Sequence, residues 1–209
     1  MVYHIKHVVK GAPANFVVGD MPFGAYNGDI NKAVENATRI FAEGGCDCVK
    51  MEGGMNAVPY IEAVVKAGIP VMGHIGLTPQ SSAMMGGFKV QGKSNAAALH
   101  LLETAKAVEK AGAFLINLEG MPSGVAKKIT EELTIPTMGI GAGPHCDSQD
   151  LVWPDILGMS DWVPKFVKKY ADLRTIVIDA LDTFADEVNT GAFPTPEYSY
   201  NTKVEGFEE

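Results

Sequence analysis

One stretch of the chain decides its fold: residues 48–76 read CVKMEGGMNAVPYIEAVVKAGIPVMGHIG. It opens with a short apolar run that ends in a polar residue beside glycine, at Glu52. A segment with helical spacing follows, which Asn56 can cap and Gly68 can end. A second apolar run then ends at His74. The order of strand, helix and strand predicts a βαβ unit.

The same pattern recurs along the chain. Further apolar runs lie at residues 16–20, 113–120 and 135–143, with a weak sixth near 155–159. Helical segments separate the runs, at residues 29–43, 56–68, 94–112 and 122–133. Asp29 and Ser94 are candidate N-caps. Strands joined through helices run parallel, so the sequence predicts an α/β fold whose strands all end at one edge of the sheet.

The C-terminal part of the chain has a different pattern. Residues 165–188 carry apolar side chains at helical spacing, and no strand follows them. The last fifteen residues have the composition of a tail. Since no linker divides the chain, we expect a single α/β domain over residues 1–194 and a tail over 195–209.

Composition limits the classes of function. The 209 residues include 17 Lys and Arg against 25 Asp and Glu, a net charge of −8. Such an acidic chain is a poor binder of nucleic acid or anionic membranes, so the expected partner is a small molecule or a metal ion. Three cysteines, two of them close together, suit reduced thiols in a cytoplasm. The N-terminus lacks the apolar core of a secretory signal, and the uncharged residues 67–88 contain too many glycines and prolines for a spanning helix.

Ionisable side chains end the predicted strands, where active sites of α/β folds lie. Asp20 and Glu52 end successive strands and offer the oxygen ligands that Mg²⁺ prefers. The alternative is that each carboxylate caps the next helix, although Asp29 and Asn56 lie closer to those helices. Lys50 shares a strand face with Glu52, and a lysine there must be paired or face a polar cavity.

Two further side chains are expected at the same edge. His74 precedes a loop of about eighteen residues, 76–93, which is long enough to form a lid; a purely structural histidine is the alternative. Glu119 ends an apolar strand and suits a general base, whereas an ion pair with Lys127 is the alternative. The glycines within residues 139–143 suit either a phosphate cradle or a tight turn.

Six segments together resemble the ketopantoate hydroxymethyltransferase family. They are FVVGDMPFGAY (16–26), VKMEGG (49–54), VMGHIGLTPQ (71–80), GGFKVQG (86–92), LEGMP (118–122) and IGAG (140–143). They occur in the family's order, and HIGLTPQ followed by GGFKVQG is the most specific. The resemblance implies a TIM-type (β/α)8 barrel of the phosphoenolpyruvate mutase/isocitrate lyase-like superfamily. In that family two strand–helix units precede the region matched here, so the expected barrel lacks its first units.

The resemblance also implies an activity. It is the Mg²⁺-dependent transfer of a hydroxymethyl group from 5,10-methylenetetrahydrofolate to 3-methyl-2-oxobutanoate, which gives 2-dehydropantoate in pantothenate biosynthesis. By family match Asp20 and Glu52 serve the metal, and Glu119 accepts the proton. Lys50 and His74 would bind the substrate together with Asp20. A cytoplasmic homo-oligomer is expected.

One family feature has no counterpart in the sequence. The family carries a VGDS-like strand end whose aspartate and serine bind metal and substrate, whereas Val18-Gly19-Asp20 is followed by Met21. The chain alone is therefore expected to be weakly active or inactive, and to associate through open strand edges. Two other functions fit the residues: a different Mg²⁺-dependent α-keto acid lyase or mutase of the same superfamily, and a non-catalytic subunit.

Overall fold

The computed structural model describes residues 1–207, so the last two residues of the predicted tail lie outside the described part. Contacts within the chain divide it into two compact units, Met1–Asp150 and Leu151–Glu209. The single domain expected over residues 1–194 stays a prediction.

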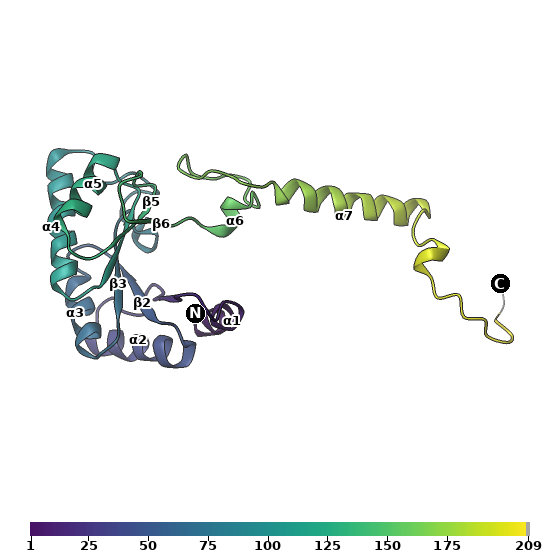
Figure 1. The fold of residues 1–209 in the computed structure, drawn as a ribbon, viewed down its shortest axis with the longest axis horizontal. Helices are drawn as coiled ribbons and strands as arrows, with labels where there is room; N and C mark the ends of the chain where they lie inside the picture. Colours follow the sequence, from purple (N-terminus) through teal and green to yellow (C-terminus); the bar gives the residue numbers. More distant parts are fainter. Residues whose placement is uncertain (208–209) are drawn as a thin grey trace. The chain divides into compact units, whose positions relative to one another are not determined.

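The first unit alternates strands and helices (Figure 1). Its helices are α1 (Val2–Gly11), α2 (Ile30–Gly44), α3 (Val58–Lys66), α4 (Asn95–Lys110) and α5 (Ser123–Glu132), with the 3-10 helix η1 (Pro79–Ser81). Its strands are β1 (Val18–Asp20), β2 (Cys48–Glu52), β3 (Val71–Gly76), β4 (Leu115–Glu119), β5 (Thr137–Ile140) and β6 (Ser148–Gln149). These strands form one parallel sheet in chain order, from β1 to β6. The predicted parallel α/β fold is confirmed.

Five strands lie where the sequence predicted them, but the sixth does not. The residues expected as a strand, 155–159, begin inside the helix α6 (Trp153–Ile156) and continue as a turn. Pro154 suits the first turn of a helix, where its missing N–H costs nothing. Gly158 has a φ of +67°, in the left-handed region, whereas the residues of an extended strand have negative φ.

Two of the three predicted N-caps are confirmed, those at Asp29 and Ser94, and the one predicted at Asn56 is wrong. The carboxylate of Asp29 accepts hydrogen bonds from two backbone N–H groups in the first turn of α2. The hydroxyl of Ser94 accepts one from Ala97 in α4. Asn56 does not cap α3, which begins after Ala57 without any side-chain cap. Proline in the first turn leaves α3 one fewer N–H to satisfy.

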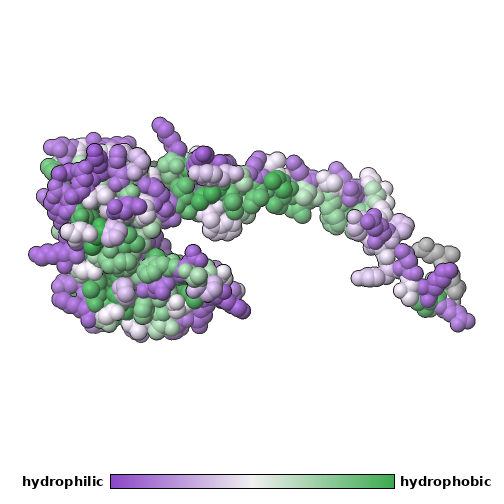
Figure 2. All heavy atoms as spheres, viewed as in Figure 1, coloured by the Kyte–Doolittle hydropathy of each residue, from purple (hydrophilic) through white to green (hydrophobic). Residues whose placement is uncertain are grey.

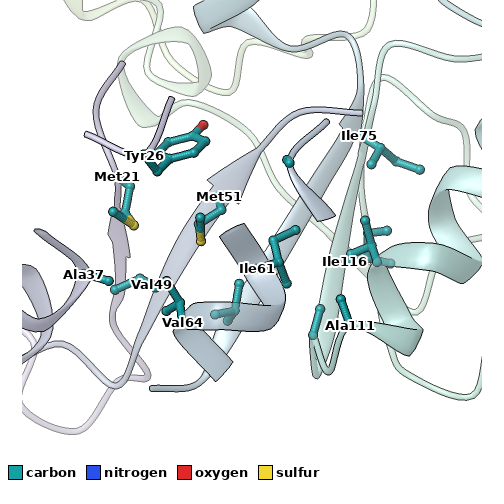
Figure 3. Packing of buried hydrophobic residues seen from close by; sticks show 14 of the residues in the cluster. Met21, Tyr26, Ala37, Val49, Met51, Ile61, Val64, Ile75, Ala111 and Ile116 are labelled. Carbon is teal, nitrogen blue, oxygen red and sulfur yellow. The ribbon is translucent and has the colours of Figure 1, made fainter. Parts of the chain in front are cut away.

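The hydrophobic core lies between the sheet and the helices that cover one of its faces (Figure 3). Met51 and Ile116 from the sheet join Ile61 of α3 in this core. Gly73 faces the same way, because a Cβ on it would meet the side chain of Val108 in α4. Since side chains alternate along a strand, the residues between these positions point to the opposite side of the sheet, here called the inner face.

The second unit contains α6, the helix α7 (Leu173–Thr190) and the 3-10 helix η2 (Pro196–Tyr198). The helix predicted from residue 165 begins only at Leu173, because the N–H groups of Tyr170 and Leu173 bond to carbonyls near the end of α6 instead of to a preceding helical turn. Every residue of α7 is at least partly exposed, and Figure 2 shows hydrophobic residues at its surface. Within residues 1–207 no helix has the length and apolar character that crossing a membrane requires.

Candidate active site

The inner face carries the ionisable residues that the sequence placed at the strand ends. Backbone register sets Asp20 beside Lys50, and Glu52 beside His74. The predicted substrate, metal and base residues are all on this face, together with an asparagine that the sequence analysis did not single out: Asp20, Lys50, Glu52, His74, Asn117 and Glu119.

Asp20 and Lys50 form an ion pair, with Lys50 Nζ 3.1 Å from Asp20 Oδ2. Burial raises the pKa of Asp20, although the neighbouring ammonium lowers it in part. Within the described residues, the other carboxylate oxygen, Oδ1, is buried without a hydrogen-bond partner. Both side chains line a cavity of about 520 Å³, together with Met72 and Met138. The cavity therefore combines a cation, a carboxylate and an apolar wall.

His74 lies between two carboxylates. Its ring is 1% exposed; Nδ1 is 3.4 Å from Glu52 Oε2 and Nε2 is 3.0 Å from Glu119 Oε2. Neither contact has the linear geometry of a good hydrogen bond, and each becomes an ion pair when the ring is protonated. Burial alone would lower the pKa of His74, but the interactions with Glu119 and Glu52 outweigh it and raise that pKa. The ring is thus suited to a positive charge that holds both carboxylates.

The alternative role for Glu119 is wrong. Lys127 pairs within its own helix, with Nζ 3.8 Å from Glu131 Oε1. Glu119 instead turns to His74 on the inner face and is 9% exposed. Its carboxylate is therefore part of the site.

Glu52 is held by the loops around it. Its Oε1 accepts a hydrogen bond from the backbone N–H of Gln80 at 2.6 Å. Its backbone N–H donates to the hydroxyl of Tyr26 at 3.1 Å, and that hydroxyl donates to the carbonyl of Glu52 at 2.8 Å. Neither Glu52 nor Asp20 caps a helix, so the capping alternative is wrong for both.

The loop after β3 contains η1 and a series of turns over residues 79–87. A cavity of about 620 Å³ opens between this loop and the end of β2, with Glu52, Thr78, Ser81 and Met85 among its lining residues. The lid role of the loop stays a prediction. In the glycine-containing stretch at residues 139–143, Gly143 has a φ of +82° and packs against Ser123, which fits a tight turn.

Three residues of the site were missed by sequence reasoning. Tyr26 and Gln80 lie inside recognised motifs, but a contact between residues 54 positions apart has no local signal. Asn117 could have been found, because it precedes Glu119 by two residues and so must share its face. It is 2% exposed and, among residues 1–207, its Oδ1 has no partner.

Asp20 and Glu52 are the two carboxylates of the site that could hold a divalent cation. Residues 1–207 contain no group of three His, Cys, Asp or Glu side chains arranged to hold a metal ion. Mg²⁺, however, is commonly held by one or two carboxylates, with substrate and water filling the remaining positions. The unpartnered Oδ1 of Asp20 and the nearby carboxylate of Glu52 fit that mode.

Comparisons with known proteins agree with the motifs. The family model described as ketopantoate hydroxymethyltransferase matches residues 1–196. The 3-methyl-2-oxobutanoate hydroxymethyltransferase of Heliobacterium modesticaldum is 55% identical over 201 residues, which are 96% of this chain and 73% of the relative. The enzyme of the same name from Clostridioides difficile is 52% identical over 96% of this chain and 74% of its own length.

A solved structure of phosphonopyruvate hydrolase matches the fold with a TM-score of 0.54, over 96% of this chain and 70% of that chain. At 12% identity this likeness concerns the fold alone, and it agrees with the expected TIM-type α/β fold. The six strands in chain order form a half-barrel of that type. With 96% of its length aligned to enzymes of one name and a family model spanning residues 1–196, the chain belongs to the ketopantoate hydroxymethyltransferase family of transferases.

Proposed function

We propose that the chain transfers a hydroxymethyl group from 5,10-methylenetetrahydrofolate to 3-methyl-2-oxobutanoate and so produces 2-dehydropantoate, at the low rate expected without a VGDS-like strand end. The observation that carries the proposal is the arrangement of the inner face. There the Asp20–Lys50 pair lines a cavity, and the carboxylate of Glu119 is held by a buried histidine.

Lys50 would bind the carboxylate of the oxo acid. The Lys50 side chain lines the cavity and is only 19% exposed, so a bound anion would displace little water and gain a strong charge-assisted contact. The apolar wall formed by Met72 and Met138 suits the branched methyl groups of the substrate. His74 would lie beside the same substrate, because its ring is between the carboxylates of Glu52 and Glu119.

Glu119 would take the proton from C3 of the oxo acid. The electron pair of that C–H bond then forms the C2–C3 double bond of an enolate, and the negative charge moves to the C2 oxygen. The contact with His74 fixes the direction of the Glu119 carboxylate, which a proton transfer requires. C3 of the enolate next forms a bond to the methylene carbon of the donor as one of the two bonds from that carbon to tetrahydrofolate nitrogens breaks. Water then supplies the hydroxyl oxygen as the second carbon–nitrogen bond breaks, and the two nitrogens take up the proton from C3 and one proton from the water.

Asp20 and Glu52 would hold Mg²⁺. When bound, the ion supplies Lewis acidity that stabilises negative charge on the keto oxygen. Among the protein groups, Asp20 contributes its unpartnered Oδ1, while Gln80 and His74 keep the Glu52 carboxylate in place.

The loop after β3 would cover the site and exclude water until C3 has formed its bond to the methylene carbon. A homo-oligomer in a cytoplasm is part of the same proposal. The test is formation of 2-dehydropantoate from both substrates with Mg²⁺, followed by mass spectrometry. Product that depends on the folate donor supports the proposal. Turnover of another α-keto acid without folate would favour a lyase or mutase, and tight binding of the oxo acid without any turnover would favour a non-catalytic subunit.

A further inference from the structure

Gln80 joins the ends of three strands. It follows β3 and its backbone N–H donates to Glu52 Oε1, at the end of β2, at 2.6 Å. Its side-chain Nε2 donates to the carbonyl oxygen of Met21 at 2.9 Å. Met21 directly follows Asp20, the last residue of β1. One residue thus contacts the carboxylate of Glu52 and the backbone next to Asp20.

Tyr26 completes this network. Its hydroxyl, on a side chain that is 2% exposed, lies 2.8 Å from the carbonyl of Glu52 and 3.2 Å from Gln80 Oε1, and can donate its one hydrogen to either. It also accepts the N–H of Glu52 at 3.1 Å. The hydroxyl therefore fixes the backbone of Glu52, while the N–H of Gln80 fixes its carboxylate.

The role of Gln80 can be separated from core packing. Tyr26 belongs to the hydrophobic core cluster, whereas Gln80 does not and is half-buried. The side chain of Gln80 forms both of its hydrogen bonds with the loop that follows β1, here called the β1 loop, at Met21 and Tyr26. Losing the carboxamide would free that loop relative to β3 but leave the backbone contact to Glu52.

We infer that Gln80 is a positioning residue that sets the separation of the Asp20 and Glu52 carboxylates for a divalent cation. The inference rests on the proposed function, which assigns the cation to these two residues. Residues that orient metal ligands typically change metal affinity on the order of tenfold to a hundredfold when they are replaced. Gln80 would act in this way by tying the β1 loop to the residue that bonds Glu52.

The test is the affinity for Mn²⁺, a paramagnetic substitute for Mg²⁺, titrated into the full chain and followed by electron paramagnetic resonance. Gln80→Met keeps the length of the side chain and removes both of its hydrogen bonds. We expect its Mn²⁺ affinity to fall by roughly tenfold or more, with little change in the metal-free melting temperature. Gln149→Met is the matched control, because Gln149 Nε2 also donates one bond to a backbone carbonyl, that of Gly143, away from the carboxylates.

A second measurement tests the network itself. Tyr26→Phe removes the shared hydroxyl, and the double variant Tyr26→Phe/Gln80→Met should lose less affinity than the two single losses combined. Gln80→Met with wild-type affinity, or Gln149→Met with an equal loss, would overturn the role of Gln80 while leaving the proposed function intact. A wild-type chain that binds no Mn²⁺ would instead contradict the metal role of Asp20 and Glu52, and this inference with it.

Discussion

The ring of His74 stands beside the carboxylate of Glu119, with Nε2 3.0 Å from Oε2, and both side chains are buried on the inner face of the sheet. The pair comes from neighbouring strands, β3 and β4, which hydrogen-bond in parallel register. A buried carboxylate beside a histidine has a fixed direction, which the proposed role of Glu119 as proton acceptor requires.

Replacing Glu119 with Gln should remove the base and preserve the fold. The amide keeps the size of the side chain but cannot accept the C3 proton, so turnover should fall by about 10²–10⁴-fold. Affinity for Mn²⁺ should remain, since Asp20 and Glu52 are untouched. Steady-state kinetics and a metal titration check this, with Glu131→Gln in the exposed α5 pair as control. A variant that keeps wild-type turnover would exclude Glu119 as the base.

The raised pKa of His74 predicts how stability depends on pH. In the unfolded chain histidine titrates near 6.5, and the folded state holds its proton to higher pH. The stabilising contribution is therefore fully present below about pH 6.5 and is lost as the pH rises through the folded pKa. Urea unfolding in metal-free buffer should show the wild type losing stability relative to His74→Gln above about pH 6.5. If the free energies of unfolding of the wild type and His74→Gln keep a constant difference across that pH range, a raised pKa of His74 is contradicted.

Lys50 should matter for substrate binding more than for folding. Lys50→Met removes the ammonium from the cavity, and losing a charged contact raises the KM for the oxo acid by about tenfold to a hundredfold. Lys66→Met is the control, because Lys66 forms an exposed pair with Glu62 on α3. Equal KM values in the two variants would remove Lys50 from the substrate site.

Asp29, which caps α2, and Asn56, which does not cap α3, should differ in their contribution to stability. Asp29→Ala should lower the free energy of unfolding by ~1 kcal/mol, because Asp29 accepts two backbone hydrogen bonds. Asn56→Ala should change it by less than about 0.5 kcal/mol, because Asn56 is exposed and caps nothing. Thermal or urea unfolding of both variants decides, and an equal loss in both would mean that Asn56 does cap α3 in solution.

Much of the fold was predictable because apolar runs and helix-ending glycines recur at regular spacing. Asp20, Glu52, His74 and Glu119 were placed at one edge by that rule alone. β6 has two residues, which are too few to show a strand pattern in the sequence. The sixth strand was therefore predicted at the apolar run near 155–159. The start of α7 depended on backbone bonds to α6, which spacing does not reveal.

The partners of each site residue could not be read from the sequence. That His74 bridges two carboxylates depends on the register of three strands. The contacts of Gln80 with Met21 and Tyr26 join residues 59 and 54 positions apart, and periodicity carries no information at that range.

Hydrogen exchange at C3 of 3-methyl-2-oxobutanoate tests the central claim most directly, because it isolates proton removal from the later carbon transfer. The oxo acid is incubated with the chain and Mg²⁺ in D₂O without folate, and loss of the C3 proton signal is followed by nuclear magnetic resonance. The proposed site predicts exchange well above the protein-free rate, abolished in Glu119→Gln. Exchange that persists unchanged in Glu119→Gln, or that the wild-type chain does not accelerate at all, would contradict it.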